Sequence, residues 1–292
     1  MFKRYLICTD LVDGLQRLTA FIPALAQAGG QQFVFTHTVP IWAEGDIPRL
    51  DEAKIAEAQT VLDAALAHQG EGREVIVDIQ SGKPQDMIPK LVQKYNSDVV
   101  LMGTATRSLI QETIFGSNSL AIARSTAVPL MLLRPQLINT YTQAELTLRC
   151  QNLWRYLLIP YSGSESAKYL LEQLKATVQA AGANAPQKCL LLTVVSETKR
   201  KGISSDYQQQ AAAEQLAQAE AELASCGIEV TTEVRVGDPM QEITHAAIKH
   251  DITAIAIAHV SRSALLELTA PSFANEILRH SWFPVLFFSP KG

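Results

Sequence analysis

The stretch VVLMGTATRSLIQETIFGSNSLAIARSTAVPLMLLRP, residues 99–135, has a counterpart later in the chain, AIAIAHVSRSALLELTAPSFANEILRHSWFPVLFFSP, residues 254–290. The two stretches align without a gap at an offset of 155 residues, which places Arg107 on Arg262. Repeats of this kind are sought first because they decide the architecture. A single register held over so long a span indicates that the chain is a tandem duplication.

Each copy alternates short apolar runs with longer stretches of helical period. Runs of this length, bounded by turn residues, are typical of strands that are buried on both faces of a sheet. The expected strands of the first copy are Tyr5–Thr9, Phe33–Val39, Val75–Ile79, Val99–Met102 and Leu130–Leu133. The expected helices are Gln16–Ala28, Asp51–Gln69 and Gln85–Tyr95 in the first copy, and Ala167–Ala181 and Gln208–Cys226 in the second. This alternation predicts an α/β fold with a parallel sheet and helices on both faces.

The length of 292 residues suits two domains better than one core. We place the first domain at residues 1–135 and the second at residues 154–292. The stretch 136–153 between them has no strong period and is predicted to be a linker.

Composition excludes several classes of function. The net charge of -4 argues against nucleic acid as a partner, because nucleic-acid binding depends on Lys and Arg that neutralise phosphates. The chain has no apolar run near the roughly 20 residues that span a bilayer, so no membrane insertion is expected. Its four cysteines lack C-x-x-C spacing, and the first residues lack the apolar core of a signal peptide. We expect a cytoplasmic protein with reduced thiols.

Three positions of the first copy converge on one edge of the predicted sheet. Doubly wound sheets bind ligands beyond the carboxyl ends of their strands. Gly103 ends the fourth strand, and Gly116-Ser117 opens the last helix, where free N–H groups and the helix dipole favour phosphate. Asp10 ends the first strand and can accept hydrogen bonds from a base or a ribose. These positions predict a ligand site in the first copy.

The same loop carries a family resemblance. Nucleotide-binding universal stress proteins have a glycine, two residues, a glycine, nine residues, and then glycine with Ser or Thr. This chain has Gly103, Thr106 in place of the second glycine, and Gly116-Ser117 at the same spacing. The chain therefore resembles this family over the loop between the fourth strand and the last helix.

Two further motifs of the family are present. Asp10 matches the aspartate that ends the first strand, although Leu11-Val12 follow it where the family usually has Gly-Ser. The family's Gly-x-Pro after the third strand occurs in both copies, at 82–84 and 237–239. The resemblance covers nearly the whole chain twice and points to a tandem universal stress protein.

The resemblance implies a five-stranded sheet of order 3-2-1-4-5 and an adenine nucleotide. The ligand would be ATP with Mg, with AMP or a cyclic dinucleotide as alternatives, and Asp10 would lie at its adenosine end. The phosphates would be held by Gly103, Thr106, Arg107, Gly116, Ser117 and Ser119. Such proteins are similar to stress-response regulators more than to enzymes, with at most slow ATP hydrolysis.

The second copy has a degenerate nucleotide loop. Ala258 stands where the first copy has Gly103, and Pro271, which lacks an N–H, stands where it has Gly116. Ser162 takes the place of Asp10. We therefore expect the ligand in the first domain only.

Other interpretations remain open. Both sites can have decayed, which would leave a ligand-free module that binds an unknown protein partner. The segment Ser162–Ser166 resembles the pyrophosphate loop of ATP pyrophosphatases but lacks its second glycine and its aspartate. The apolar edge strands Leu130–Leu133 and Val285–Phe288 predict an intramolecular pseudo-dimer, with a homodimer as a further alternative.

Overall fold

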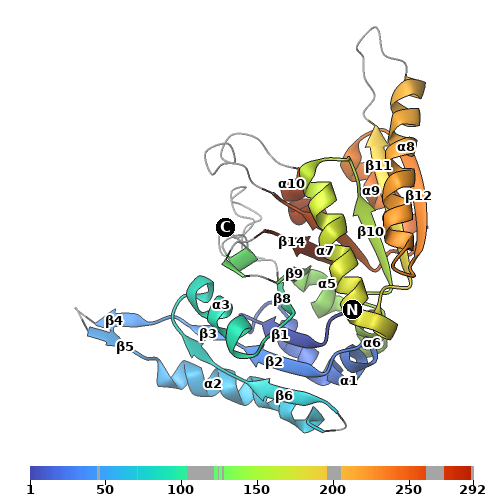
Figure 1. The fold of residues 1–292 in the computed structure, drawn as a ribbon. Coiled ribbons are helices and arrows are strands. Elements are labelled where there is room, and N and C mark those ends of the chain that lie inside the picture. The colour runs from blue at the N-terminus through green and yellow to red at the C-terminus, as the bar shows by residue number, and fades with distance from the viewer. Residues whose placement is uncertain are drawn as a thin grey trace. The chain divides into compact units, whose positions relative to one another are not determined.

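The structure, a computed structural model, describes residues 1–44, 47–70, 72–103, 122–123, 125–126, 128–195, 205–260 and 273–290. The chain divides into two compact units, Phe2–Gln151 and Asn152–Phe288 (Figure 1). We call them the first unit and the second unit. No helix that the structure describes has both the length and the apolar character to cross a membrane.

The first unit is built on five parallel strands. They are β1 (Arg4–Cys8), β2 (Gln32–Thr36), β6 (Glu74–Val77), β8 (Val99–Gly103) and β9 (Leu130–Leu133). Their hydrogen-bonded order is β6-β2-β1-β8-β9, which is 3-2-1-4-5 when the five strands are counted along the chain. The short strands outside this sheet are β3 (Thr38–Val39), β4 (Trp42–Glu44), β5 (Ile47–Arg49) and β7 (Gln80–Ser81).

The first crossover of this unit departs from its sequence prediction. One helix is predicted over Gln16–Ala28, but the structure has a 3₁₀ helix at Leu15–Phe21 followed by α1 (Ile22–Gln27). Pro23 lies in the first turn of α1, where its missing N–H is tolerated, so the α-helix begins there rather than passing through it. The other helices before β8 are α2 (Glu52–Leu62), a 3₁₀ helix at Asp63–His68, and α3 (Pro84–Lys94).

The segment predicted as a linker, 136–153, is largely helical. It contains α5 (Pro135–Thr140) and α6 (Gln143–Gln151), and both belong to the first unit. The Arg17 guanidinium donates hydrogen bonds to the backbone carbonyls of Ile138 and Tyr141, the latter at 3.0 Å. Helices as short as these give little periodic signal in the sequence, and tertiary contacts such as these hold them. The first unit therefore extends to Gln151.

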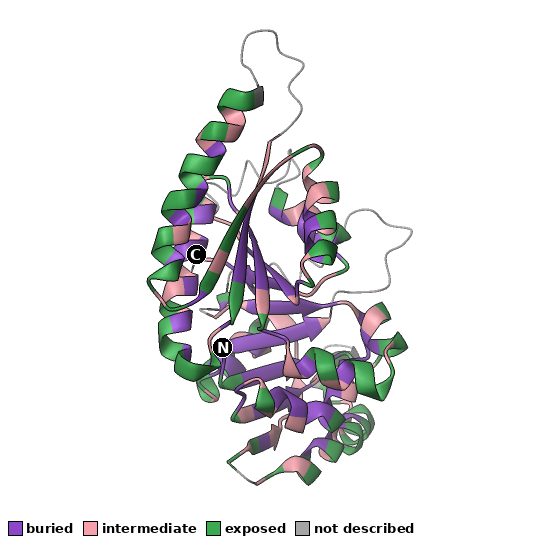
Figure 2. Cartoon of the chain, turned by 90° about the vertical axis from the view of Figure 1, so that its right-hand side faces the viewer, coloured by how far each residue is buried: buried purple, intermediate pink, exposed green. Residues whose placement is uncertain are grey.

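The second unit repeats the sheet. Its strands are β10 (Tyr156–Pro160), β11 (Lys188–Val195), β12 (Glu229–Val236), β13 (Ala254–Ala258) and β14 (Val285–Phe288), in the order β12-β11-β10-β13-β14. Figure 1 shows α7 (Glu165–Ala181) and α8 (Ser205–Ala224) on one face, and α9 (Pro239–Lys249) and α10 (Phe273–His280) on the other. Figure 2 shows that the outward face of α8 is exposed. Leu216 and Leu223 of this helix are buried. The predicted helices Ala167–Ala181 and Gln208–Cys226 are thus present with slightly different bounds.

Candidate functional site

The register of the two sheets lets their strand ends be compared position by position. Tyr5 of β1 pairs with Val99, and Leu157 of β10 pairs with Ala254. Val99 and Ala254 are equivalent in the repeat, so Tyr5 and Leu157 are equivalent too. Counting forward from this pair places Ser162 on Asp10, Gly163 on Leu11, and Glu165 on Asp13.

The loops after β1 and β10 make the same backbone turn. Leu11 has φ 67° and its equivalent Gly163 has φ 68°, both in the left-handed region. Glycine adopts this conformation freely, whereas another L-residue is disfavoured there by about 1–2 kcal/mol. The same turn is therefore strained at Leu11 in the first unit and unstrained at Gly163 in the second.

In the first unit Asp10 serves its own loop. Its Oδ1 accepts hydrogen bonds from the backbone N–H groups of Val12 (2.9 Å) and Asp13 (2.7 Å). An aspartate that accepts backbone N–H groups two and three residues on is a common means of fixing a turn. Asp10 is exposed, and these two bonds give this predicted ligand residue a structural role in the turn.

Asp13, which sequence analysis did not single out, fills the space beside Gly103. Its carboxylate is buried and accepts hydrogen bonds from the Thr9 hydroxyl (2.7 Å) and the Leu15 N–H (2.9 Å). Burial raises the pKa of this carboxyl, against the effect of those two hydrogen bonds. A Cβ atom on Gly103 would lie 2.8 Å from Asp13 Oδ2. Gly103 is therefore needed to make room for the chain's own carboxylate.

The sequence does contain a signal for Asp13, which lies two residues before the helical segment that begins at Leu15. An aspartate near the start of a helix often accepts hydrogen bonds from the free N–H groups of the first turn. Of the predicted ligand residues, the structure describes Asp10 and Gly103. It brings both into contact with Asp13, since the Asp10 N–H lies 3.4 Å from Asp13 Oδ2. The other predicted residues lie outside the described part of the chain: Thr106, Arg107, Gly116, Ser117 and Ser119.

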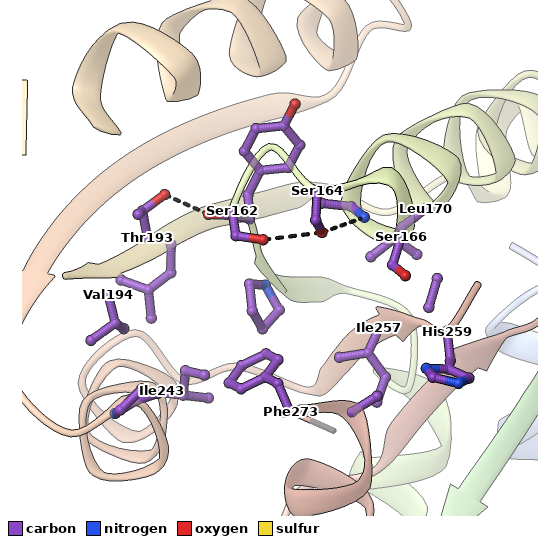
Figure 3. A pocket seen from close by; sticks show the side chains of 17 residues that line it. Ser162, Ser164, Ser166, Leu170, Thr193, Val194, Ile243, Ile257, His259 and Phe273 are labelled. Atoms are coloured by element: carbon purple, nitrogen blue, oxygen red, sulfur yellow. Dashed lines mark hydrogen bonds between the residues drawn. The ribbon is translucent and has the colours of Figure 1, made fainter. Parts of the chain in front are cut away.

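The second unit has a cavity of about 330 Å³ at the carboxyl ends of β10, β11 and β13 (Figure 3). Residues at or just after the ends of those strands line it, together with the starts of α7, α9 and α10. The lining residues are Pro160, Tyr161, Ser162, Ser164, Ser166, Ala167, Leu170, Leu192, Thr193, Val194, Pro239, Ile243, Ile257, Ala258, His259, Phe273 and Ala274. This is the edge of the sheet where doubly wound folds bind ligands.

Serine hydroxyl groups form one side of this cavity and are held in place by hydrogen bonds. Ser162 donates to Ser164 Oγ (3.1 Å), and Ser164 Oγ also accepts from the N–H of Ala167 as the N-cap of α7 (3.3 Å). Ser166 Oγ accepts from the N–H of Val260 (3.0 Å). These bonds fix the serine oxygens at the start of α7.

Apolar side chains form the opposite side, where Figure 3 shows Ile243, Phe273 and Ile257 facing the serines. Ile243 and Ile257 are buried, and Phe273 is 40% exposed. None of the lining residues named above is Asp, Glu, Lys or Arg. Within the described ranges, no group of three or more His, Cys, Asp or Glu side chains is placed to hold a metal ion. The described walls of the cavity are thus suited to hydrogen bonding and apolar contact.

Comparison with known proteins places both copies in one family. The model of the universal stress protein family matches residues 1–134 and 154–289. A universal stress protein of Thermus aquaticus, from the QAH/OAS sulfhydrylase 3′ region, is 28% identical over 138 residues, covering 46% of this chain and 100% of the relative.

Solved structures share the fold over the whole chain. A universal stress protein from Archaeoglobus fulgidus has a TM-score of 0.64 at 19% identity and covers 99% of this chain and 98% of its own. A protein described as a universal stress protein from Pseudomonas aeruginosa has a TM-score of 0.60 at 13% identity, covering 99% and 94%. The duplicated sequence, the repeated sheet and the two family matches agree: this chain belongs to the universal stress protein family and carries two of its domains in tandem.

Proposed function

We propose that the protein is a ligand-binding regulator that takes an adenine nucleotide or nucleoside in the cavity of the second unit. The observation that carries the proposal is the position of that cavity at the carboxyl ends of three strands of a doubly wound sheet. The adenine class follows from the family resemblance of the sequence. ATP with Mg, AMP and a cyclic dinucleotide are the nucleotides to test.

The geometry of the first unit supports this location. The sequence predicts a ligand in the first domain only, through Asp10, Gly103 and a loop outside the described residues. Asp10 Oδ1 accepts two hydrogen bonds from its own turn, and the Asp13 carboxylate lies beside Gly103. We propose that the first unit is the ligand-free one, which makes it the candidate for contact with a protein partner.

A regulatory role is favoured over catalysis. A hydrolytic site needs an activated nucleophile, a positioned base or a metal. The described walls of the cavity offer serine hydroxyls whose bonds run to one another and to backbone N–H groups. We expect at most slow ATP hydrolysis, measured as phosphate release by the purified chain.

Calorimetric titration of the ligand-stripped chain tests the proposal. Ala274 lines the cavity and is 7% exposed, so Ala274→Leu places three more carbons in it. We expect binding near one ligand per chain and at least a tenfold loss in Ala274→Leu. Ala221→Leu, the same change at an exposed position of α8 that does not line the cavity, should bind like wild type.

Binding that survives Ala274→Leu would contradict the location. No binding of any adenine compound would contradict the proposal and favour the alternative of a ligand-free protein-interaction module.

A further inference from the structure

Among the residues that the structure describes around it, the cavity of the second unit offers a phosphate no permanently charged partner. Tyr161 and His259 are the titratable residues among those that line it, and none of the lining residues is Lys or Arg. Glu222 of α8 acts on the same wall, because the pKa of Tyr161 is raised by burial and, second, by that carboxylate. Burying a charged group without a partner costs several kcal/mol.

Two backbone donors at this edge are already used. Phosphate binds at helix N-termini through free N–H groups. Here the N–H of Ala167 in the first turn of α7 donates to Ser164 Oγ, and the N–H of Val260 donates to Ser166 Oγ. The chain's own hydroxyls therefore occupy two donors that a phosphate would need. The Ser164 and Ser166 hydroxyls keep their hydrogens, each of which can be donated to one acceptor of a ligand.

The volume of the cavity and its apolar wall also favour a small, uncharged ligand. A volume of about 330 Å³ lies near the lower end of the range for ligand pockets, about 300–1,000 Å³. Ile243, Ile257 and Phe273 present an apolar surface opposite the serines (Figure 3). A flat ring can lie on such a surface while its edge groups reach the hydroxyls.

We infer that this cavity takes an uncharged molecule of nucleoside size, with a flat ring and neutral hydrogen-bonding groups, in preference to a phosphorylated nucleotide. The inference rests on the proposed function, which makes this cavity the ligand site.

The test compares adenosine, AMP and ATP with Mg²⁺ by calorimetry on the full, ligand-stripped chain. Only the binding that Ala274→Leu removes is assigned to the cavity, so a second site in the first unit does not interfere. We expect adenosine to bind at least tenfold more tightly than AMP or ATP. Its affinity should be the same at low and high salt, because no ion pair is formed.

A charge introduced into the wall sharpens the test. Val194 lines the cavity and is half-buried, so its lysine variant can place an ammonium there. We expect Val194→Lys to raise the affinity for AMP at least threefold, and Val194→Met, of similar length but uncharged, to leave it unchanged.

Three outcomes are distinguishable. Adenosine preference together with the gain in Val194→Lys supports the inference. AMP or ATP binding in the cavity as tightly as adenosine, or no gain for Val194→Lys over Val194→Met, overturns the inference and leaves the proposed function standing. Binding of none of the three compounds overturns the proposed function itself.

Discussion

The loops after β1 and β10 have the same backbone turn and opposite contents. In the first unit the acidic side chain of Asp13 turns inward and lies against Gly103. In the second, the equivalent Glu165 is exposed in the first turn of α7, and Ala258 replaces the glycine beside an open cavity. The inward Asp13 therefore requires a glycine at position 103, because a Cβ there would lie 2.8 Å from the Asp13 carboxylate. The two equivalent acidic positions therefore differ: Asp13 turns inward and is buried, whereas Glu165 is exposed.

The largest expected effect is on the acidic position itself. Asp13→Ala removes the buried acceptor of the Leu15 N–H and the shorter of the two acceptors of the Thr9 hydroxyl, which keeps only Gln16 Oε1 at 3.4 Å. Each unpaired buried group costs about 1–3 kcal/mol, so we expect the first unit to lose roughly 2–4 kcal/mol of unfolding free energy. Urea denaturation, with amide hydrogen exchange to locate the loss, measures it.

The matched control is Glu165→Ala. Glu165 is exposed, in the first turn of α7, where it acts on the helix dipole and lies 4.0 Å from Lys168. We expect a loss of at most about 1 kcal/mol. Equal effects of the two substitutions would remove the distinction between the units.

The next effect has opposite signs in the two units. Gly163→Leu puts a side chain into the left-handed turn and a Cβ 3.0 Å from Gln215 Oε1. We expect it to destabilise the second unit by about 1–2 kcal/mol. Leu11→Gly relieves the same strain in the first unit and loses some side-chain contact and chain stiffness, so we expect a gain of roughly 0.5–1 kcal/mol. Thermal unfolding of both variants checks the two signs. A loss of stability in Leu11→Gly would show that the left-handed conformation of Leu11 does not destabilise the first unit.

Much of this fold follows from its sequence, because buried parallel strands are contiguous apolar runs. Leu130–Leu133 has the bounds of β9, and the repeat itself establishes that the second unit copies the first. Periodicity does not predict where a helix is interrupted, as at Pro23. It also does not predict whether a short aperiodic stretch such as 136–151 forms helices that pack against the domain. Those depend on contacts with residues far away in the sequence, such as the bonds of Arg17.

The site was harder to predict than the fold. The prediction from the sequence rests on the glycine that Ala258 replaces and on the N–H that Pro271 lacks, and from these it places a ligand in the first copy only. A cavity, however, is a property of the packing of many side chains and of what they leave unfilled. The usable signal was Gly163-Ser164, because it follows the first strand of the second copy where the family has Gly-Ser. The buried Asp13 of the first copy was not predicted, because Asp10 and not Asp13 matches the family's aspartate.

A smaller effect concerns pH. The pKa of Asp13 is raised in the folded protein by burial, so the folded state holds a proton that the unfolded chain has already released. This contribution to stability is present below the ordinary aspartate pKa of about 3.9 and is lost as pH rises through the raised value. We expect wild type to gain stability relative to Asp13→Asn as pH falls through this window.

Urea midpoints of wild type and Asp13→Asn at several pH values test this, because the neighbouring Asp10 and His37 are common to both proteins. A constant difference between them would mean that Asp13 titrates normally.

The smallest effect compares two surface ion pairs at equivalent positions. In the first unit, Lys94 Nζ lies 2.8 Å from Asp78 Oδ2, and in the second, Lys249 Nζ lies 3.1 Å from Glu233 Oε1. Glu233 has a second cation, Arg235, also at 3.1 Å, where the first unit has an uncharged glutamine. Removing Lys249 therefore leaves Glu233 paired with Arg235. Removing Lys94 takes an ammonium from Asp78, whose carboxylate keeps the neutral hydrogen-bond donors Gln80 and Tyr95.

We accordingly expect Lys94→Ala to cost more than Lys249→Ala, with both in the range of about 0.2–1 kcal/mol that is usual for exposed pairs. Both lysine side chains are more than half exposed, at 58% and 61%, so salt should screen the two effects alike. Urea denaturation at low salt and in 1 M NaCl checks the order and its disappearance. A larger cost for Lys249→Ala would mean that Arg235 does not compensate Glu233, because Glu242 at 3.3 Å already engages its guanidinium.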